Sequence, residues 1–169
     1  TSARIVFGEV FDAAGAVTWR VEAIAEALAA SGVEVQALPD GRTALWEKLA
    51  YLAPFSALTA AARLPVGRLW PLPAVREAFA LGVGEVARVA GAEGIALPAG
   101  LLDRVLAFVG GLAPESKSSL LVDLESGRRL EIEALQGAVV RRGRRHGVPT
   151  PVLAALYAAL KPYEIGRAH

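Results

Sequence analysis

The stretch SSLLVDLESGRRLEIEALQGAVVRRGRRHGVPTP, residues 118–151, decides the fold class of the C-terminal part of this chain. Ser118-Ser119 is a typical helix opening, because a hydroxyl can accept from the free backbone N–H groups of a first turn. Ser126-Gly127 separates two segments of helical character. Thr150-Pro151 predicts a further helix, with threonine at the N-cap and proline at the first helical position.

The same helical spacing of apolar residues continues upstream of this stretch. Pro54 lies inside the first helical segment and is expected to kink it or split it in two, because proline lacks a backbone N–H. Residues 65–73, with Trp70, are predicted to be a loop. We therefore expect helices over residues 43–62, 75–92, 101–112, 116–125, 128–146 and 151–161.

The first 39 residues have a different pattern. A short β-branched run over residues 4–10, a helical segment over 17–30 and an alternating run over 33–38 predict one βαβ unit with parallel strands. Two strands do not make a stable sheet, so this unit is typical of the edge of a larger one. The turn at residues 39–41 is the expected boundary between domains 1–39 and 40–169.

The composition excludes several classes of function. The 169 residues are 54% apolar and 21% charged, with a net charge of +1, which argues against a nucleic-acid-binding protein. There is no cysteine and there are two histidines, so thiolate and histidine-rich metal sites are not expected. No apolar run predicts a membrane span and no signal pattern is visible, which favours a cytoplasmic location.

Residues 82–87, GVGEVA, match the GxGxxA form of the dinucleotide fingerprint. That turn binds phosphates only directly after a strand and at the start of a helix. Here the residues lie inside a helical pattern without a preceding strand, so we interpret the match as coincidental.

Lys48 and Glu131 are each open to a structural and a functional interpretation. Lys48 shares its predicted helix face with Leu45, Leu52 and Phe55, and a half-buried lysine can exchange a proton near neutral pH. The alternative is a side chain that extends from the edge of the core to water. Glu131 is expected on the apolar face of the 128–146 helix, where a carboxylate either pairs with another group or works in a site.

The remaining polar groups carry weaker signals. Ser118-Ser119 can bind a carboxylate at a helix N-terminus or simply cap that helix. The arginines at residues 141–145 are explained by the helix dipole and a solvated face, with a phosphate-binding role as the alternative. No serine has a histidine placed to activate it, so a hydrolase triad is not indicated.

Several segments together resemble the C-terminal domain of the ketopantoate reductase (2-dehydropantoate 2-reductase) family. Order and spacing both fit, and the resemblance covers nearly the whole chain. Residues 4–38 resemble the tail of that family's Rossmann domain, and the front of that domain, with its GxGxxG loop, has no counterpart here. The segments are LWEKL (45–49), ALTA (57–60), SSLLVDLESGR (118–128), EIEALQG (131–137) and HGVPTP (146–151).

The resemblance implies a mainly α fold, in which an all-helical domain like the C-terminal domain of 6-phosphogluconate dehydrogenase follows a βαβ remnant of a Rossmann domain. It implies reduction of ketopantoate to pantoate with NADPH, on the route to pantothenate and coenzyme A. Lys48 would donate the proton to the ketone oxygen, Ser119 would bind substrate, and Glu131 would lie near the nicotinamide ribose and the Lys48 ammonium. No metal is implied. This chain alone is expected to be inactive.

Four positions depart from the family pattern. Asparagines are usual where this chain has Leu52, Ser56, Val66 and Ser116. Ser56 and Ser116 have shorter polar side chains than asparagine, and we expect them to bind substrate in its place. Each lost hydrogen bond to a polar substrate costs about 1–3 kcal/mol.

These departures leave alternatives open. The alternatives to a ketopantoate reductase are a reductase of a different 2-oxoacid and a structural or dimerisation module whose site has decayed. The apolar helical domain also favours a homodimer.

Overall fold

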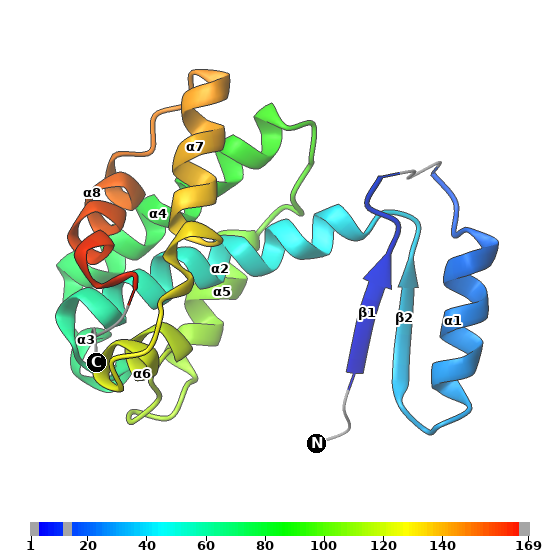
Figure 1. The fold of residues 1–169 in the computed structure, drawn as a ribbon, viewed down its shortest axis with the longest axis horizontal. Helices are drawn as coiled ribbons and strands as arrows, with labels where there is room; N and C mark the ends of the chain where they lie inside the picture. Colours follow the sequence, from blue (N-terminus) through cyan, green and yellow to red (C-terminus); the bar gives the residue numbers. More distant parts are fainter. Residues whose placement is uncertain (1–3, 12–14, 166–169) are drawn as a thin grey trace. The chain divides into compact units, whose positions relative to one another are not determined.

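The computed structural model describes residues 4–11 and 15–165. The chain divides into two compact units, residues 1–47 and 48–169, and each is described by itself. Figure 1 shows that helices make up most of the described chain and that strands occur only near its N-terminus. The mainly α fold predicted from the sequence is confirmed.

The first unit contains the βαβ arrangement expected from the sequence. Strand β1 (Arg4–Gly8) pairs in parallel with β2 (Glu34–Leu38), and α1 (Trp19–Ala29) connects them. Thr18 caps α1, since its hydroxyl accepts from the Val21 amide at 3.4 Å. Within the described residues the sheet has two strands.

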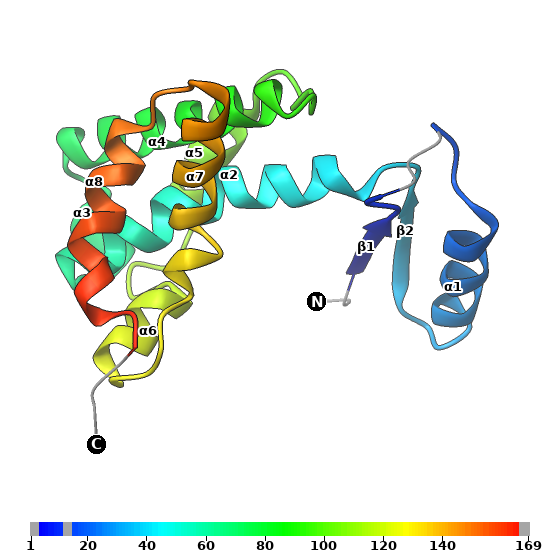
Figure 2. The ribbon, with the colours of Figure 1, turned by 45° about the horizontal axis from the view of Figure 1, so that its top comes forward.

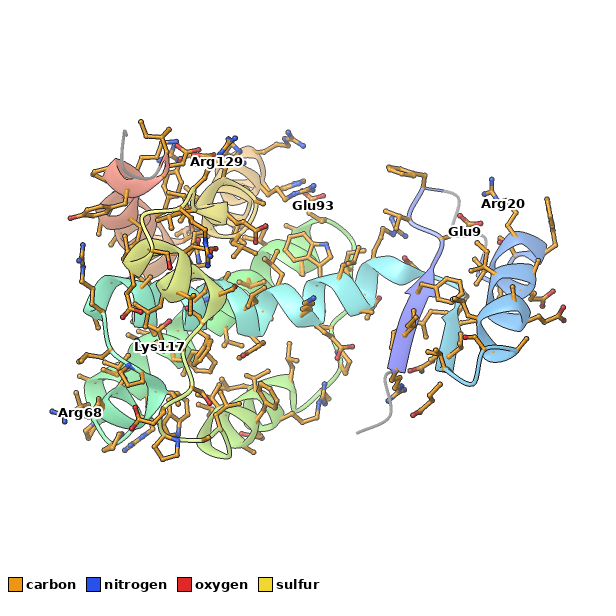
Figure 3. The ribbon with its side chains drawn as sticks, turned by 60° about the horizontal axis from the view of Figure 1, so that its bottom comes forward. Glu9, Arg20, Arg68, Glu93, Lys117 and Arg129 are labelled. Carbon is orange, nitrogen blue, oxygen red and sulfur yellow. The ribbon has the colours of Figure 1, made fainter. Side chains whose placement is uncertain are left out.

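Glu9 anchors the start of α1 to the end of β1. Its carboxylate accepts from the Thr18 hydroxyl at 2.7 Å and from Arg20 Nη2 at 2.9 Å, and Figure 3 shows Glu9 and Arg20 near one another. The hydrogen bond from Thr18, followed by that from Arg20, lowers the pKa of Glu9. Strand β1 ends at Gly8, two residues before the predicted end at residue 10. The Glu9 side chain instead holds the first residues of α1 by hydrogen bonds.

The second unit is built from helices. Helices α4, α7 and α8 pack against one another (Figures 1 and 2). A core cluster of buried residues from α2, α6, the η1 region and α8 lies beside them, with Leu121 and Ile132 completely buried. Helix α2 (Gly41–Ala62) begins in the first unit and continues into the second from Lys48. The other elements of the second unit are α3 (Val66–Leu69), α4 (Pro73–Ala92), α5 (Leu101–Gly110), α6 (Ser119–Glu125), η1 (Glu131–Glu133), α7 (Gln136–His146), α8 (Pro151–Leu160) and η2 (Lys161–Tyr163).

Pro54 does not split α2, which is one helix from Gly41 to Ala62, so the split expected from the sequence is wrong. The proline ring is buried against Gly82 of α4, where an added Cβ would lie 2.8 Å from Pro54 Cβ. Packing between α2 and α4 therefore compensates for the stability that α2 loses because proline cannot donate a backbone hydrogen bond. GVGEVA, residues 82–87, lies inside α4, which confirms that it is not a nucleotide-binding turn.

We expect Gly82→Ala to lower the free energy of unfolding by about 1–3 kcal/mol, because its methyl group overlaps Pro54. Gly91→Ala is the matched control in the same helix, since nothing lies within 4 Å of its added Cβ. That control should be stabilising by about 0.5–1 kcal/mol through helix propensity. Urea unfolding of both variants measures the difference, and equal effects would contradict the close helix crossing.

Helix α8 begins at Pro151 as predicted, but Thr150 does not cap it with its side chain. The carboxylate of Glu85 on α4 does so instead, accepting from the Val152 amide at 2.8 Å and the Leu153 amide at 2.9 Å. Glu85 is 1% exposed. A side chain of α4 thus satisfies two of the free backbone N–H groups at the start of α8.

Two other predicted boundaries are wrong. The segment 128–146 is not one helix, because Leu130 and Ile132 are drawn into the core and the Leu130 amide donates to the Glu164 carbonyl at 2.8 Å. The segment 65–73 is not all loop, since it contains α3. Among the described helices, none has the length and apolar character that crossing a membrane requires.

Candidate functional site

Lys48 lies on α2, in its second turn, with an exposed side chain. The helix face predicted to carry it becomes buried only further along, since Leu45 is 57% exposed, Leu52 is half-buried and Phe55 is 5% exposed. No described residue forms an ion pair or hydrogen bond with the Lys48 ammonium. The amino group is therefore accessible to a ligand that approaches this side of α2.

Ser56, two turns further along α2, is completely buried. Its hydroxyl accepts from Gln136 Nε2 at 2.9 Å, and the same amide nitrogen donates to the Ala53 carbonyl at 2.7 Å. Ser56 thus joins α2 to the start of α7. Gln136 is also completely buried, so this polar contact lies inside the core.

The serines near α6 differ in their surroundings. Ser118 is the N-cap of α6, where its hydroxyl accepts from the Leu121 amide at 3.1 Å and lies 2.7 Å from the Thr59 hydroxyl of α2. Ser119 is the first residue of α6 and its side chain is exposed. Ser116 is half-buried, and its carbonyl accepts from the Val66 amide at 3.0 Å. The capping role considered for this pair therefore belongs to Ser118, and the Ser119 hydroxyl faces solvent.

Glu131 is exposed at the start of η1, and it is not on the apolar face of a continuous helix as predicted. Its neighbour Ile132 is completely buried, which fixes the turn to the core. Glu133, which the sequence pattern did not single out, carries the contacts of this turn instead. Its carboxylate accepts from the Tyr157 hydroxyl at 2.5 Å and from Lys161 Nζ at 2.5 Å, and it also binds Arg141.

Helix α2 connects these predicted site residues. It carries Lys48, it binds the start of α7 through Ser56, and it binds the start of α6 through Thr59. Ser119 and the η1 turn with Glu131 each lie next to one of these anchored helix starts. An exposed ammonium, hydroxyl and carboxylate are thus attached to one hydrogen-bonded framework, and no two of them bind one another directly.

Two of the four arginines of α7, Arg141 and Arg142, bind carboxylates. Arg142 donates to Glu93 at 2.7 Å, and His146 Nε2 lies 3.0 Å from the other oxygen of Glu93. Arg141 binds Glu133. Among residues 4–11 and 15–165, no cluster of three metal-ligating side chains occurs.

The Glu133 contacts predict a pH dependence of stability. Hydrogen bonds from Lys161, then Tyr157 and Arg141, lower the pKa of Glu133 from 4.5 to about 2. Glu133 therefore stabilises the fold above its unfolded-state pKa, and this contribution is lost as pH falls from about 4.5 toward 2. The same contact raises the pKa of Lys161, whose contribution is lost only in strongly alkaline solution.

Urea unfolding measured across the acid range tests this dependence. Glu133→Gln should be less stable than the unsubstituted protein at neutral pH, and the difference should shrink as pH falls through the window between the two pKa values. Glu131→Gln is the control, since Glu131 is exposed on the same turn. A difference that is independent of pH would exclude the carboxylate of Glu133 as its source.

Comparison with known proteins shows which sequences this chain is similar to. The family model described as ketopantoate reductase PanE/ApbA C terminal matches residues 40–164. A 2-dehydropantoate 2-reductase of Halobacterium salinarum is 34% identical over 142 residues, which are 84% of this chain and 46% of that protein. One of Caulobacter vibrioides is 36% identical over 139 residues, 82% of this chain and 47% of that protein.

Solved structures show the same relationship. A PanE/ApbA family ketopantoate reductase from Ralstonia eutropha superposes with a TM-score of 0.84 at 32% identity, over 97% of this chain and 52% of that one. A 2-dehydropantoate 2-reductase from Methylococcus capsulatus superposes with a TM-score of 0.84 at 31% identity, over 97% of this chain and 51% of that one. The chain spans about half the length of the relatives it matches.

Proposed function

The chain belongs to the ketopantoate reductase family, and on that premise we propose that it supplies the substrate-binding and proton-donating part of an NADPH-dependent 2-oxoacid reductase. The reaction proposed for the whole protein is reduction of ketopantoate to pantoate. The observation that carries this proposal is Lys48, an exposed ammonium on α2 without a carboxylate partner among the described residues.

The chemistry requires a proton donor at the ketone. NADPH, when bound, supplies the hydride that adds to C2 of the oxoacid. The negative charge that develops on the ketone oxygen is stabilised by a nearby cation, and Lys48 transfers a proton from Nζ to that oxygen. The product is a 2-hydroxy acid, and the neutral amine of Lys48 recovers its proton from solvent.

The other residues bind and orient. The exposed hydroxyl of Ser119 at the start of α6 can donate to a substrate carboxylate, and the exposed carboxylate of Glu131 can accept from a ribose hydroxyl of the nucleotide. Ser116 remains a proposed substrate contact. Ser56 is proposed to act on substrate indirectly, because its buried hydroxyl already accepts from Gln136.

Binding of the nucleotide phosphates is proposed to fall outside the described residues. GVGEVA, the GxGxxA sequence at residues 82–87, is inside α4, and Gly82 is packed against Pro54. Among the described residues, we propose that Glu131 contacts the nicotinamide end of the cofactor. We also propose that the protein is cytoplasmic and forms a homodimer.

A second candidate is a reductase of a different 2-oxoacid. Two positions where the family usually has asparagine carry apolar side chains, the half-buried Leu52 and the 3% exposed Val66. Apolar residues there favour a substrate with fewer hydroxyl groups than ketopantoate, since a lost hydrogen bond to a polar substrate costs about 1–3 kcal/mol.

The test is an assay of NADPH oxidation by the whole protein with ketopantoate and with straight-chain, branched and aromatic 2-oxoacids. Turnover of ketopantoate at the highest kcat/KM supports the first candidate, and a preference for a less polar oxoacid supports the second. Absence of turnover with every oxoacid would exclude both and favour a structural module.

A further inference from the structure

A cavity of about 250 Å³ lies in the helical unit, and Val66, where the family usually has asparagine, is one of its lining residues. It is formed by α3, the start of α4, the end of α5 and the following loop, and its apolar walls include Val66, Val109, Leu112 and Pro114. None of Lys48, Ser56, Ser116, Ser119 and Glu131 lines it. Its volume is below the roughly 300–1,000 Å³ of pockets for drug-sized ligands, so it fits a smaller molecule.

One charged side chain enters this apolar cavity. Arg76, in the first turns of α4, is half-buried, and its Nη1 donates to the Trp70 carbonyl at 2.6 Å. No described carboxylate binds Arg76, which distinguishes it from Arg141 and Arg142. A guanidinium has five N–H donors, and the single carbonyl contact leaves most of them available.

The position of Arg76 on its helix strengthens the positive field. The first turn of a helix carries the positive end of the dipole, so a cation there is unfavourable unless an anion offsets it. The first turn of α4 contains no acidic residue. A guanidinium with apolar walls around it, at the positive end of a helix, is therefore matched to an anionic ligand.

A second donor lies on the same cavity. Trp70 lines it, and the indole Nε1–H has no acceptor among the residues that the structure describes. Gly110 faces this nitrogen, and an added Cβ would lie 3.1 Å from it. The glycine thus keeps the space beside the indole N–H open, so a ligand in the cavity can accept from it.

We propose that this cavity is a second binding site for a small monocarboxylate with a branched apolar tail. The carboxylate binds the Arg76 guanidinium and accepts from the Trp70 indole, and the tail packs against Val109, Leu112 and Pro114. The planar guanidinium favours a carboxylate through paired hydrogen bonds. We propose this site as separate from the one that holds Lys48 and Ser119, neither of which lines the cavity.

The test uses the whole protein labelled with 5-fluorotryptophan and titrated with isovalerate, with ¹⁹F NMR as the readout. Trp70→Phe assigns the Trp70 resonance by its disappearance. We expect isovalerate to shift this resonance in a saturable way, acetate to bind more weakly because it lacks the tail, and isovaleramide to bind at least about tenfold more weakly because it lacks the charge.

Three variants separate the proposal from its alternatives. Arg76→Gln should weaken isovalerate binding by about tenfold or more, whereas Arg68→Gln, which removes an exposed arginine on α3 (Figure 3), should not. Lys48→Ala should leave the binding unchanged, which distinguishes this cavity from the proposed substrate site. Equal binding of isovaleramide, equal loss in both arginine variants, loss in Lys48→Ala, or no saturable shift would each overturn the proposal.

Discussion

Replacement of Lys48 by methionine is expected to lower kcat of the whole enzyme by about 10²–10⁴-fold, the usual contribution of a general acid. Methionine keeps much of the length and apolar volume of the lysine side chain and removes its proton. Because Lys48 is exposed and has no partner among the described residues, the substitution should leave the free energy of unfolding within about 0.5 kcal/mol of its original value.

Lys117→Met is the matched control for this experiment. Lys117 is also a surface lysine, but its ammonium binds Glu125 at 2.9 Å and has no proposed role in the reaction. Its kcat should be unchanged. Steady-state kinetics of both variants, with 2-oxoacid and NADPH varied in turn, separate a loss in kcat from a rise in KM. A Lys48→Met enzyme with full kcat would remove Lys48 from the mechanism and leave the family assignment untouched.

Replacement of Glu85 by alanine should give the largest loss of stability. The carboxylate accepts from two backbone amides at the start of α8, and it is 1% exposed. Each buried N–H left without a partner costs about 1–3 kcal/mol, so the expected loss in the free energy of unfolding is about 2–6 kcal/mol. The lost side-chain volume beside α8 adds to this effect.

Glu77→Ala is the control, because Glu77 is an exposed glutamate on the same helix. Its effect should stay within about 0.5 kcal/mol. Glu85→Gln should lie between the two, since one amide oxygen replaces two acceptors and the NH₂ group faces a backbone donor. Chemical unfolding of the three variants measures the series. A loss of stability that is no larger in Glu85→Ala than in Glu77→Ala would show that the capping carboxylate contributes little.

The sequence predicted those features of the fold that depend on residues close together in the chain. The parallel strands, the start of α6 beside Ser118 and the start of α8 at Pro151 follow from strand propensity, capping and the fixed backbone angle of proline. Lys48, Ser119 and Glu131 were identified from a resemblance, since their spacing alone left structural interpretations open.

Tertiary contacts account for what the sequence did not reveal. Pro54 stays within an unbroken helix because Gly82 receives it, and a pattern along one helix cannot show a partner 28 positions away. The η1 turn interrupts the expected 128–146 helix because Leu130 is drawn into the core. Glu133 was missed because Tyr157 and Lys161 come from a later part of the chain.

The Glu85 carboxylate also makes helix α8 depend on α4. The two carboxylate oxygens of Glu85 accept from amides that lie 67 and 68 positions later in the chain. The hydrogen bonds of the first turn of α8 therefore depend on a residue that is distant in sequence. A helix as short as α8 is marginal in isolation. We therefore expect α8 to be stably helical only when it is packed against α4, so that any variant that loosens α4 also loosens the C-terminal helix.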